Sequence, residues 1–257
     1  MSDDGGQRVE VEDDDGVRVI AFNRPEARNA FDQAMYQAVA GALVDGATDE
    51  TVRVLVVTGR GVAFTAGQDL REMAALATGA AGPGAGTGFP ALLDALQTCP
   101  KPLVAAVNGV GVGLGFTLLA HVDLVLIDEE ARLKVPFAEL GVPPEAASSL
   151  LLPFRMGWQR ASAALLASEW VDARAAVEGG IALRACPAGT VLDEAVVLAR
   201  KIASYPDHAV REIKRLMTEP YREAITTARR REDAAFAALF ADPTVNPGAS
   251  LASGLGG

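Results

Sequence analysis

The N-terminal part of the chain alternates apolar and polar residues with the period of a β-strand. Val9 to Glu12 and Val17 to Phe22 follow this alternation, and the turn-forming residues Asp13 to Gly16 lie between them, which predicts a β-hairpin. From Asp32 to Asp45 the pattern changes, because large apolar residues recur at helical spacing. This segment is predicted to be a helix.

Further along, apolar runs alternate with helical patterns, and the end of the chain is helical. Strands are predicted over Val52 to Thr58, Leu103 to Val107, Val122 to Ile127 and, shorter, Arg132 to Val135, and a helical turn over Pro136 to Gly141. Helices are predicted over roughly Leu92 to Leu96, Gln159 to Ser168, Ala173 to Glu178, Leu192 to Ala203, Ala209 to Met217 and Tyr221 to Phe240. We therefore expect an α/β fold with a core over residues 1–190 and a helical C-terminal region over 191–257. Two segments, Gly79 to Gly88 and the tail from Asp242, have the composition of mobile or frayed chain.

Alternating glycines follow the strand that begins at Leu103. They are Gly109, Gly111, Gly113 and Gly115, and an apolar segment from Phe116 to Ala120 comes next, so a strand, a glycine loop and a helix start are predicted. Glycine lets a backbone approach a ligand closely, and a helix N-terminus offers unpaired N–H groups, which together suit a negative charge. The alternative is that the glycines serve only tight packing. The spacing does not match the standard dinucleotide or P-loop motifs.

A second small-residue loop, Gly59 to Leu70, follows the strand at Val52 to Thr58. Asp69 lies where it could cap the next helix. N–H donors from two separate loops can converge on one oxygen, which is how an oxyanion hole is commonly built.

Composition narrows the class of protein. The chain has 257 residues, half of them apolar, and no apolar run of about 18 residues that would span a membrane. The acidic N-terminus does not resemble a signal peptide, and with two distant cysteines a disulfide framework is not expected, so a cytoplasmic protein is predicted. The formal net charge of −10 argues against nucleic-acid binding, and the two histidines have no metal-ligand spacing.

Taken together, these motifs resemble those of the crotonase superfamily, also called the enoyl-CoA hydratase/isomerase family. The resemblance covers about Val9 to Phe240. It is carried by NRPEARNAFD (Asn23 to Asp32), AFTAGQDL (Ala63 to Leu70), KPLVAAVNGVGVGLG (Lys101 to Gly115), HVDLVLIDEEARLKVPFAELGVPPEAASSLLLP (His121 to Pro153) and WVDARAAVEGGIALR (Trp170 to Arg184).

The resemblance implies a fold, a substrate class and a set of site residues. The fold would be a spiral of ββα units with a helical C-terminal region that forms a homotrimer or a dimer of trimers. The substrate would be an acyl-CoA thioester, with no cofactor beyond the coenzyme A that the substrate carries, and its thioester oxygen would bind the backbone N–H groups of Gln68 and Leu114. The residues implied in CoA or substrate binding are Arg24, Ala27, Arg28, Ala30, Ala66, Gly67, Asp69 and Gly113.

The basic residues among these have a simpler interpretation, because Arg24 and Arg28 would ordinarily be solvated surface. The family's C-terminal end commonly carries an aromatic and basic segment that reaches CoA. Residues 242–257 contain no lysine or arginine, so the CoA phosphates would depend on Arg24, Arg28 or Lys101.

Carboxylates decide the reaction in this family. Hydratases of the family use two glutamates, and the matching positions here are Thr117 and Phe137, neither of which is a useful base. Glu145, which follows two prolines, matches the glutamate that moves the proton in Δ3,Δ2-enoyl-CoA isomerases. Burial among apolar neighbours such as Phe137 and Leu140 would raise its pKa. The alternative is a carboxylate that only stabilises a helix N-terminus, and Glu139 is interpreted as a surface carboxylate.

Three functions follow from the sequence. The first is a Δ3,Δ2-enoyl-CoA isomerase with Glu145 as base and acid. The second is a hydratase, or another crotonase-type lyase or hydrolase, that uses Glu145 with a water molecule. The third is a non-catalytic acyl-CoA-binding homologue.

Overall fold

Two β-sheets organise residues 7–77 and 86–242, the ranges that the computed structural model describes. The larger sheet has six strands in the order β1-β2-β3-β5-β7-β10. The strands are β1 (Val9–Asp14), β2 (Val17–Phe22), β3 (Val54–Gly59), β5 (Leu103–Val107), β7 (Leu124–Asp128) and β10 (Arg184–Cys186). The predicted hairpin is present, because β1 and β2 pair antiparallel, whereas every later neighbour in this sheet is parallel.

The smaller sheet has four strands in the order β4-β6-β8-β9. They are β4 (Ala63–Thr65), β6 (Val110–Val112), β8 (Arg132–Lys134) and β9 (Val171–Asp172). The strands β4, β6, β9 and β10 were not predicted, and β4 lies within the segment Gly59 to Leu70 that was predicted to be a loop. All four are two or three residues long, too short to show a strand period, and β6 lies within the glycine stretch.

A β-β-α unit recurs three times along the chain. A strand of the large sheet leads to a strand of the small sheet and then to a helix. The units are β3-β4-α2 with α2 at Leu70–Ala77, β5-β6-α4 with α4 at Leu114–Thr117, and β7-β8-α5 with α5 at Phe137–Leu140. Because β4, β6 and β8 are neighbours in the small sheet, the residues that follow them gather at one edge of it. This is the predicted spiral of ββα units.

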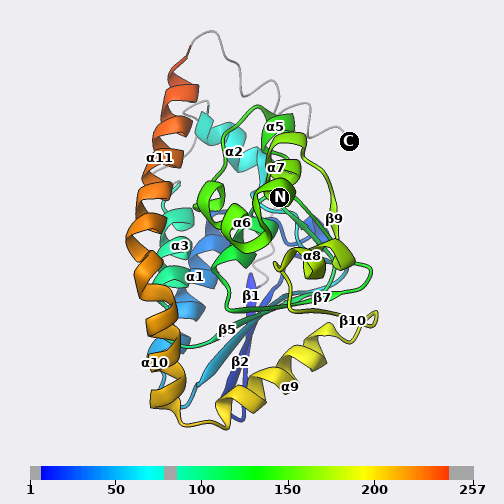
Figure 1. The fold of residues 1–257 in the computed structure, drawn as a ribbon, viewed down its shortest axis with the longest axis vertical. Helices are drawn as coiled ribbons and strands as arrows, with labels where there is room; N and C mark the ends of the chain where they lie inside the picture. The colour runs from blue at the N-terminus through cyan, green and yellow to red at the C-terminus, as the bar shows by residue number, and fades with distance from the viewer. Residues whose placement is uncertain (1–6, 78–85, 243–257) are drawn as a thin grey trace.

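Apolar residues cover both faces of the large sheet. This is expected, because its parallel strands are continuous apolar runs in the sequence. On one face, Leu55 and Val57 of β3 belong to the core shared with α1 (Gln33–Thr48) and α3 (Gly88–Thr98). On the other face, Val54 and Val56 pack with α9 (Val191–Ala203). Figure 1 shows α9 crossing below the sheet and α1 and α3 on its left side.

The remaining helices cover the site end and one flank of the molecule. They are α6 (Ser148–Met156), α7 (Trp158–Ala167), α8 (Ala173–Gly179), α10 (Asp207–Thr218) and α11 (Arg222–Ala241), with short 3-10 turns at Pro25–Ala27, Leu118–His121 and Glu219–Tyr221. Helices α10 and α11 form one long column beside α3 (Figure 1). Within the described ranges, no helix combines the length and apolarity needed to cross a membrane. Residues 79–85 of the segment predicted to be mobile, and residues 243–257 of the predicted frayed tail, lie outside those ranges.

Candidate active site

The two predicted oxyanion donors follow neighbouring strands of the small sheet. Gln68 comes after β4, and Leu114 comes after β6, with which β4 pairs. Because these strands run parallel, their carboxyl ends meet at one edge, and the two loops predicted from sequence lie against each other there.

Gln68 is held by hydrogen bonds of its neighbours rather than by its own N–H. The Phe31 N–H donates to the Gly67 carbonyl at 2.7 Å, and the Asp69 N–H donates to the Phe31 carbonyl at 2.9 Å. These two bonds form an isolated bridge between Phe31 and Gln68 that does not use the N–H of Gln68. That N–H has no acceptor among the residues described, so it is available to a ligand.

Leu114 offers the matching donor because it is the first residue of α4. The N–H of a first helical residue has no partner within the helix. Gly113, which precedes it, has φ 54° and donates its N–H to the Lys134 carbonyl at 2.8 Å, which fixes the direction of the turn. Within residues 7–77 and 86–242, no acceptor is found for the Leu114 N–H.

Gly67 brings the two donors together. A Cβ at this position would lie 2.5 Å from the Val112 carbonyl oxygen and 3.5 Å from the Leu114 nitrogen, and the φ of Gly67 is +87°. Glycine is therefore required both for the backbone conformation and for the close approach of the loops. Gly109 and Gly115 serve packing, because a Cβ would lie 2.2 Å from the Val62 carbonyl oxygen in the first case and 2.7 Å from the Thr65 carbonyl oxygen in the second.

The predicted nucleotide-binding loops, Ala27 to Ala30 and Ala66 to Asp69, lie side by side. The Ala66 N–H donates to the Arg28 carbonyl at 2.8 Å. Arg24 spans both loops, because its Nη1 donates to Asp69 Oδ2 at 2.8 Å and to the Ala30 carbonyl at 3.1 Å. Asp69 also accepts the Arg71 N–H, which is the capping role predicted for it. Arg28 is exposed at the edge of this pair of loops, and a role of these residues toward CoA stays a prediction.

Asn29, which the sequence analysis did not single out, holds this arrangement from inside. It is fully buried with φ 56°. Its amide nitrogen donates to the carbonyls of Arg60 and Ala63 at 2.9 and 2.8 Å, and its Oδ1 accepts the Arg24 N–H at 2.9 Å. Asparagine adopts the left-handed conformation more readily than most residues, but the sequence does not show which asparagine does so. The role of Asn29 is therefore visible only in the fold.

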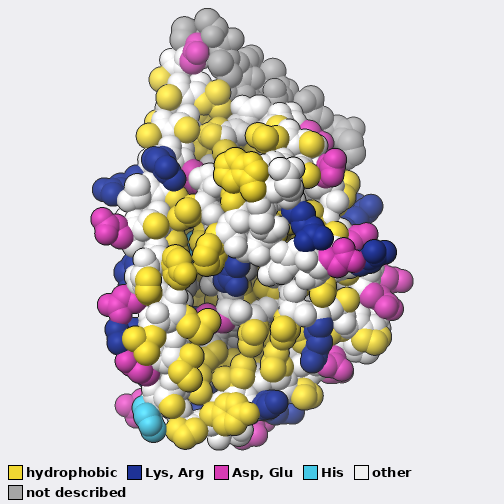
Figure 2. Space-filling model, viewed as in Figure 1, with side chains coloured by type: hydrophobic (Ala, Val, Ile, Leu, Met, Phe, Trp, Pro, Cys, Tyr) yellow, Lys and Arg dark blue, Asp and Glu magenta, His cyan; other side chains and the backbone are white. Residues whose placement is uncertain are grey.

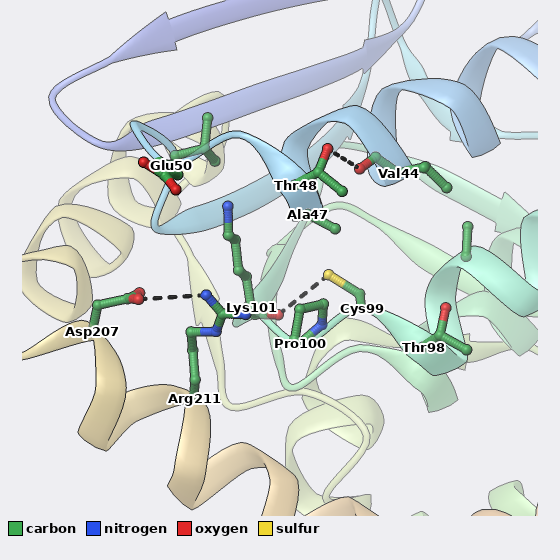
Figure 3. Close-up of a pocket in the computed structure, with 12 residues that line it drawn as sticks. Val44, Ala47, Thr48, Glu50, Thr98, Cys99, Pro100, Lys101, Asp207 and Arg211 are labelled. Carbon is green, nitrogen blue, oxygen red and sulfur yellow. Dashed lines mark hydrogen bonds and ion pairs between the residues drawn. The ribbon is translucent and has the colours of Figure 1, made fainter.

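Lys101 lies in another part of the molecule, beside a hollow of about 740 Å³ between α1, α3 and α10 (Figure 3). Its ammonium is buried and donates to the carbonyls of Gly46 and Asp49 at 2.7 and 2.5 Å. Burial also lowers the pKa of Lys101. The group thus fastens the end of α1. Apart from Lys101 itself, none of the residues predicted for catalysis or CoA binding lines the hollow.

Glu145 lies in the segment between α5 and α6, three residues before α6 begins. The side chain is half-buried, and burial raises its pKa to about 8, with the nearby Glu232 carboxylate adding to the shift. The predicted effect of burial is therefore present, whereas the contribution of Glu232 was not foreseen. At neutral pH most of the Glu145 carboxyls are protonated, which is unusual for glutamate and typical of groups that exchange protons in catalysis.

Tyr36 of α1 connects Glu145 with the oxyanion loops. Its ring lies 5.1 Å from the ring of Phe31, the residue bridged to Gln68. Burial raises the pKa of Tyr36, and the charge of Glu145 raises it further, so the two groups are electrostatic neighbours. The Tyr36 hydroxyl is buried and has no hydrogen-bond partner among the described residues. From its sequence, Tyr36 is predicted only to lie within a helix.

The two positions that carry glutamates in hydratases are both buried and both lack a carboxyl group. Thr117 is fully buried at the end of α4, and its hydroxyl has no partner among the described residues. Phe137 is buried at the start of α5. The predicted surface role of Glu139 is confirmed, because its carboxylate is exposed and pairs with Lys134 at 2.7 Å.

Chemically, the candidate groups are two backbone N–H donors on adjacent loops and one protonatable carboxyl. The donors can stabilise an oxyanion, and the carboxyl can accept and return a proton.

Known proteins resemble nearly the whole chain. Residues 12–251 match the sequence model of the family described as Enoyl-CoA hydratase/isomerase. Enoyl-CoA delta isomerase 2 from Rattus norvegicus is 34% identical over 225 residues, which are 86% of this chain and 57% of the rat protein. The chain thus spans little more than half the length of that relative.

Solved structures share the fold. The crystal structure of an enoyl-CoA hydratase/isomerase from Pseudoalteromonas atlantica T6c has a TM-score of 0.89 and 32% identity, covering 97% of both chains. The crystal structure of the enoyl-CoA hydratase EchA8_6 from Mycobacterium marinum has a TM-score of 0.78 and 45% identity, covering 83% of this chain and 100% of that one. The predicted crotonase-like fold is confirmed, and the names of the relatives include both isomerases and hydratases.

Proposed function

The chain belongs to the enoyl-CoA hydratase/isomerase family, and we propose that within this family it is a Δ3,Δ2-enoyl-CoA isomerase. The observation that carries the proposal is the carboxyl inventory of the site. Glu145 is a half-buried carboxyl with a pKa of about 8, while the positions of the two hydratase glutamates hold Thr117 and Phe137.

The proposed reaction moves one proton. The ionised Glu145 carboxylate removes a proton from C2 of a 3-enoyl-CoA, and the electron pair of that C–H bond moves toward the thioester oxygen. The N–H groups of Gln68 and Leu114 stabilise the resulting enolate oxygen, each by about 3 kcal/mol of barrier. Protonated Glu145 then gives the proton to C4, so the double bond ends between C2 and C3.

A raised pKa suits this role, because the carboxyl must take a proton from carbon and give it back to carbon. An ordinary carboxylate with a pKa near 4.5 would be a weaker base. One group on one face of the substrate suffices for a 1,3-shift. Hydration also needs a positioned and activated water, for which the family uses a second carboxylate.

The second candidate is hydration of a 2-enoyl-CoA with Glu145 and a water molecule. It is supported by the 45% identity to the Mycobacterium marinum protein, which is described as an enoyl-CoA hydratase. A non-catalytic acyl-CoA-binding homologue is the third.

One experiment separates the three. The purified chain is given a 3-enoyl-CoA and, separately, a 2-enoyl-CoA, and each product is identified by chromatography. Rapid conversion of the first to the trans-2-enoyl thioester, lost in Glu145→Gln, is the expected result. Fast hydration of the second that persists in Glu145→Gln would contradict the isomerase, and CoA binding without turnover of either would favour the binding homologue.

The homotrimer or dimer of trimers is part of the same proposal, as is a cytoplasmic location. Helix α10 has no buried residue in the single chain and exposes Ile213, Leu216 and Met217. Figure 2 shows apolar side chains gathered along the α10 column beside a hollow, and a pocket of about 460 Å³ lies between α10, α11 and α6. Light scattering of the purified chain would give the mass of the assembly.

A further inference from the structure

The segment that carries Glu145 has an unusual backbone. Ala146 and Ala147, the next two residues, have φ values of 59° and 57°. Residues with a Cβ rarely adopt this left-handed conformation, and each such residue costs about 1 kcal/mol or more unless its surroundings impose it. One local hydrogen bond closes the turn, from the Ser148 N–H to the Glu145 carbonyl at 2.9 Å. Ala147 is the N-cap of α6, and its methyl group cannot accept a hydrogen bond from the first turn of that helix, so the side-chain cap must come from elsewhere.

Glu232 of α11 supplies the missing cap from the other end of the sequence. Its Oε2 accepts the Ala147 N–H at 2.6 Å, and its Oε1 accepts the Ser149 N–H at 2.9 Å. Glu232 is buried, with only 5% of the residue exposed. A carboxylate that accepts two N–H groups at a helix N-terminus is stabilised both by hydrogen bonds and by the helix dipole.

His121 holds the same segment from a second direction. Its Nε2 lies 2.7 Å from the Ala146 carbonyl oxygen. Since a carbonyl only accepts, Nε2 carries the proton, and burial lowers the pKa of His121 to about 4, so the ring is neutral at pH 7. The Ala146 and Ala147 peptide groups are thus fixed by side chains of two separate elements.

Several titratable and charged groups surround this segment. Glu232 is the charged group that acts directly on Glu145, and both are acids, so the ionised form of each disfavours ionisation of the other. The groups that face the segment from the elements packed around it are Glu232 and Arg229 on α11, Tyr36 on α1, His121 on the turn before β7, and Arg155 on α6.

We propose that Glu232 is a positioning residue for Glu145: its carboxylate clamps the left-handed turn after the base and thereby lets α11 hold the base in the site. The proposal rests on the proposed role of Glu145 as the base. It gives α11 a part in positioning the base. The sequence does not suggest this part, because a charged run such as Arg229-Arg230-Arg231-Glu232-Asp233 is typical of a solvated helix face.

The test compares Glu232→Gln with Asp233→Asn in the full chain. Asp233 is the next residue of α11 and is exposed, so the control removes the same charge without touching the turn. The Glu145 carboxyl is titrated directly by carbon-13 NMR of glutamate-labelled protein and assigned by its loss in Glu145→Gln, and turnover of 3-enoyl-CoA is measured against pH.

In Glu232→Gln we expect the Glu145 titration to move to lower pH, because a neighbouring negative charge is gone. We also expect the high-pH plateau of kcat to fall by about 10²-fold, as for a catalytic group displaced by about 1 Å, with KM nearly unchanged. Asp233→Asn should leave both quantities as in the parent protein. Turnover that falls while the Glu145 titration stays in place would mean a merely structural role and would overturn the proposal, as would a variant that behaves like the parent.

Hydrogen exchange keeps the proposal testable if Glu232→Gln does not fold. In the unaltered protein, the amides of Ala147 and Ser149 should exchange slowly, because both are bound to Glu232, and rapid exchange at both would contradict the clamp. Titration and exchange need no substrate. If the protein fails to turn over 3-enoyl-CoA, the proposed function fails, while the role of Glu232 is still decided.

Discussion

The oxyanion loops and the Glu145 segment, the two parts of the proposed site, are held in place by different means. Gln68 and Leu114 follow paired strands, and backbone hydrogen bonds and the close contact at Gly67 fix their N–H groups. Glu145 precedes two strained alanines that are held by the side chains of His121 and Glu232, 25 and 85 residues away from their partners in the sequence.

This difference determines which substitutions each region tolerates. The donors are backbone atoms, so the side chains of Gln68 and Leu114 matter less than the absence of a Cβ at Gly67. The proposed base is a side chain on a turn with a single internal hydrogen bond, so the distant residues His121 and Glu232 also determine its position. The following predictions test the contrast.

Removal of the base has the largest expected effect. Glu145→Gln keeps the shape of the side chain but cannot accept a proton from carbon, so kcat for 3-enoyl-CoA should fall by about 10²–10⁴-fold. Glu139→Gln is the matched control, because Glu139 is an exposed carboxylate in the preceding helix. Steady-state kinetics of both variants check this, and equal activities of the two would remove Glu145 from the mechanism.

Disruption of the donor pair comes next. In Gly67→Ala the new Cβ would lie 2.5 Å from the Val112 carbonyl, so the loops must separate and kcat should fall by about 10²–10³-fold. Gly189→Ala introduces a Cβ at a similar φ of +77° with no atom within 4 Å, and it should leave kcat unchanged. An active Gly67→Ala enzyme would show that the close approach of the loops is not needed.

The pH dependence of kcat/KM reports on the proposed base and not on the donors, because backbone N–H groups do not titrate in this range. The active form of Glu145 is ionised, so kcat/KM should rise about tenfold per pH unit below pH 8 and level off above it. In Gly67→Ala the profile should keep its midpoint and lose height. A profile already flat from pH 6 upward would mean that no group with this pKa is needed.

The smallest effect concerns stability. A glutamate with a pKa of 4.5 when unfolded and about 8 when folded binds more protons in the folded state between these values, so its contribution to stability declines as pH rises. Glu145→Gln should therefore raise the free energy of unfolding at pH 8, relative to pH 5, by about 2 kcal/mol, allowing for the partial exposure of the group. Urea unfolding at both pH values measures it, with Glu139→Gln as the control that should show no such difference.

The two regions also differ in how far the sequence predicts them. Glycine spacing and the strand-loop-helix order indicate the oxyanion loops, because the relevant interactions are local or between neighbouring strands. The position of Glu145 after two prolines is visible in the sequence, but Glu232 is not, since its acceptor role depends on how α11 packs against α6. Likewise Lys101 looks available for an anion, and only the fold reveals that its ammonium is bound to the end of α1.

The most direct test of the central claim is a crystal structure with a non-reactive acyl-CoA analogue. We expect the acyl oxygen to lie about 2.7–3.1 Å from both the Gln68 and Leu114 nitrogens, and Glu145 to be the carboxyl nearest to the α-carbon. A complex in which another carboxyl is nearest to the α-carbon, or in which the acyl oxygen contacts neither nitrogen, would contradict it.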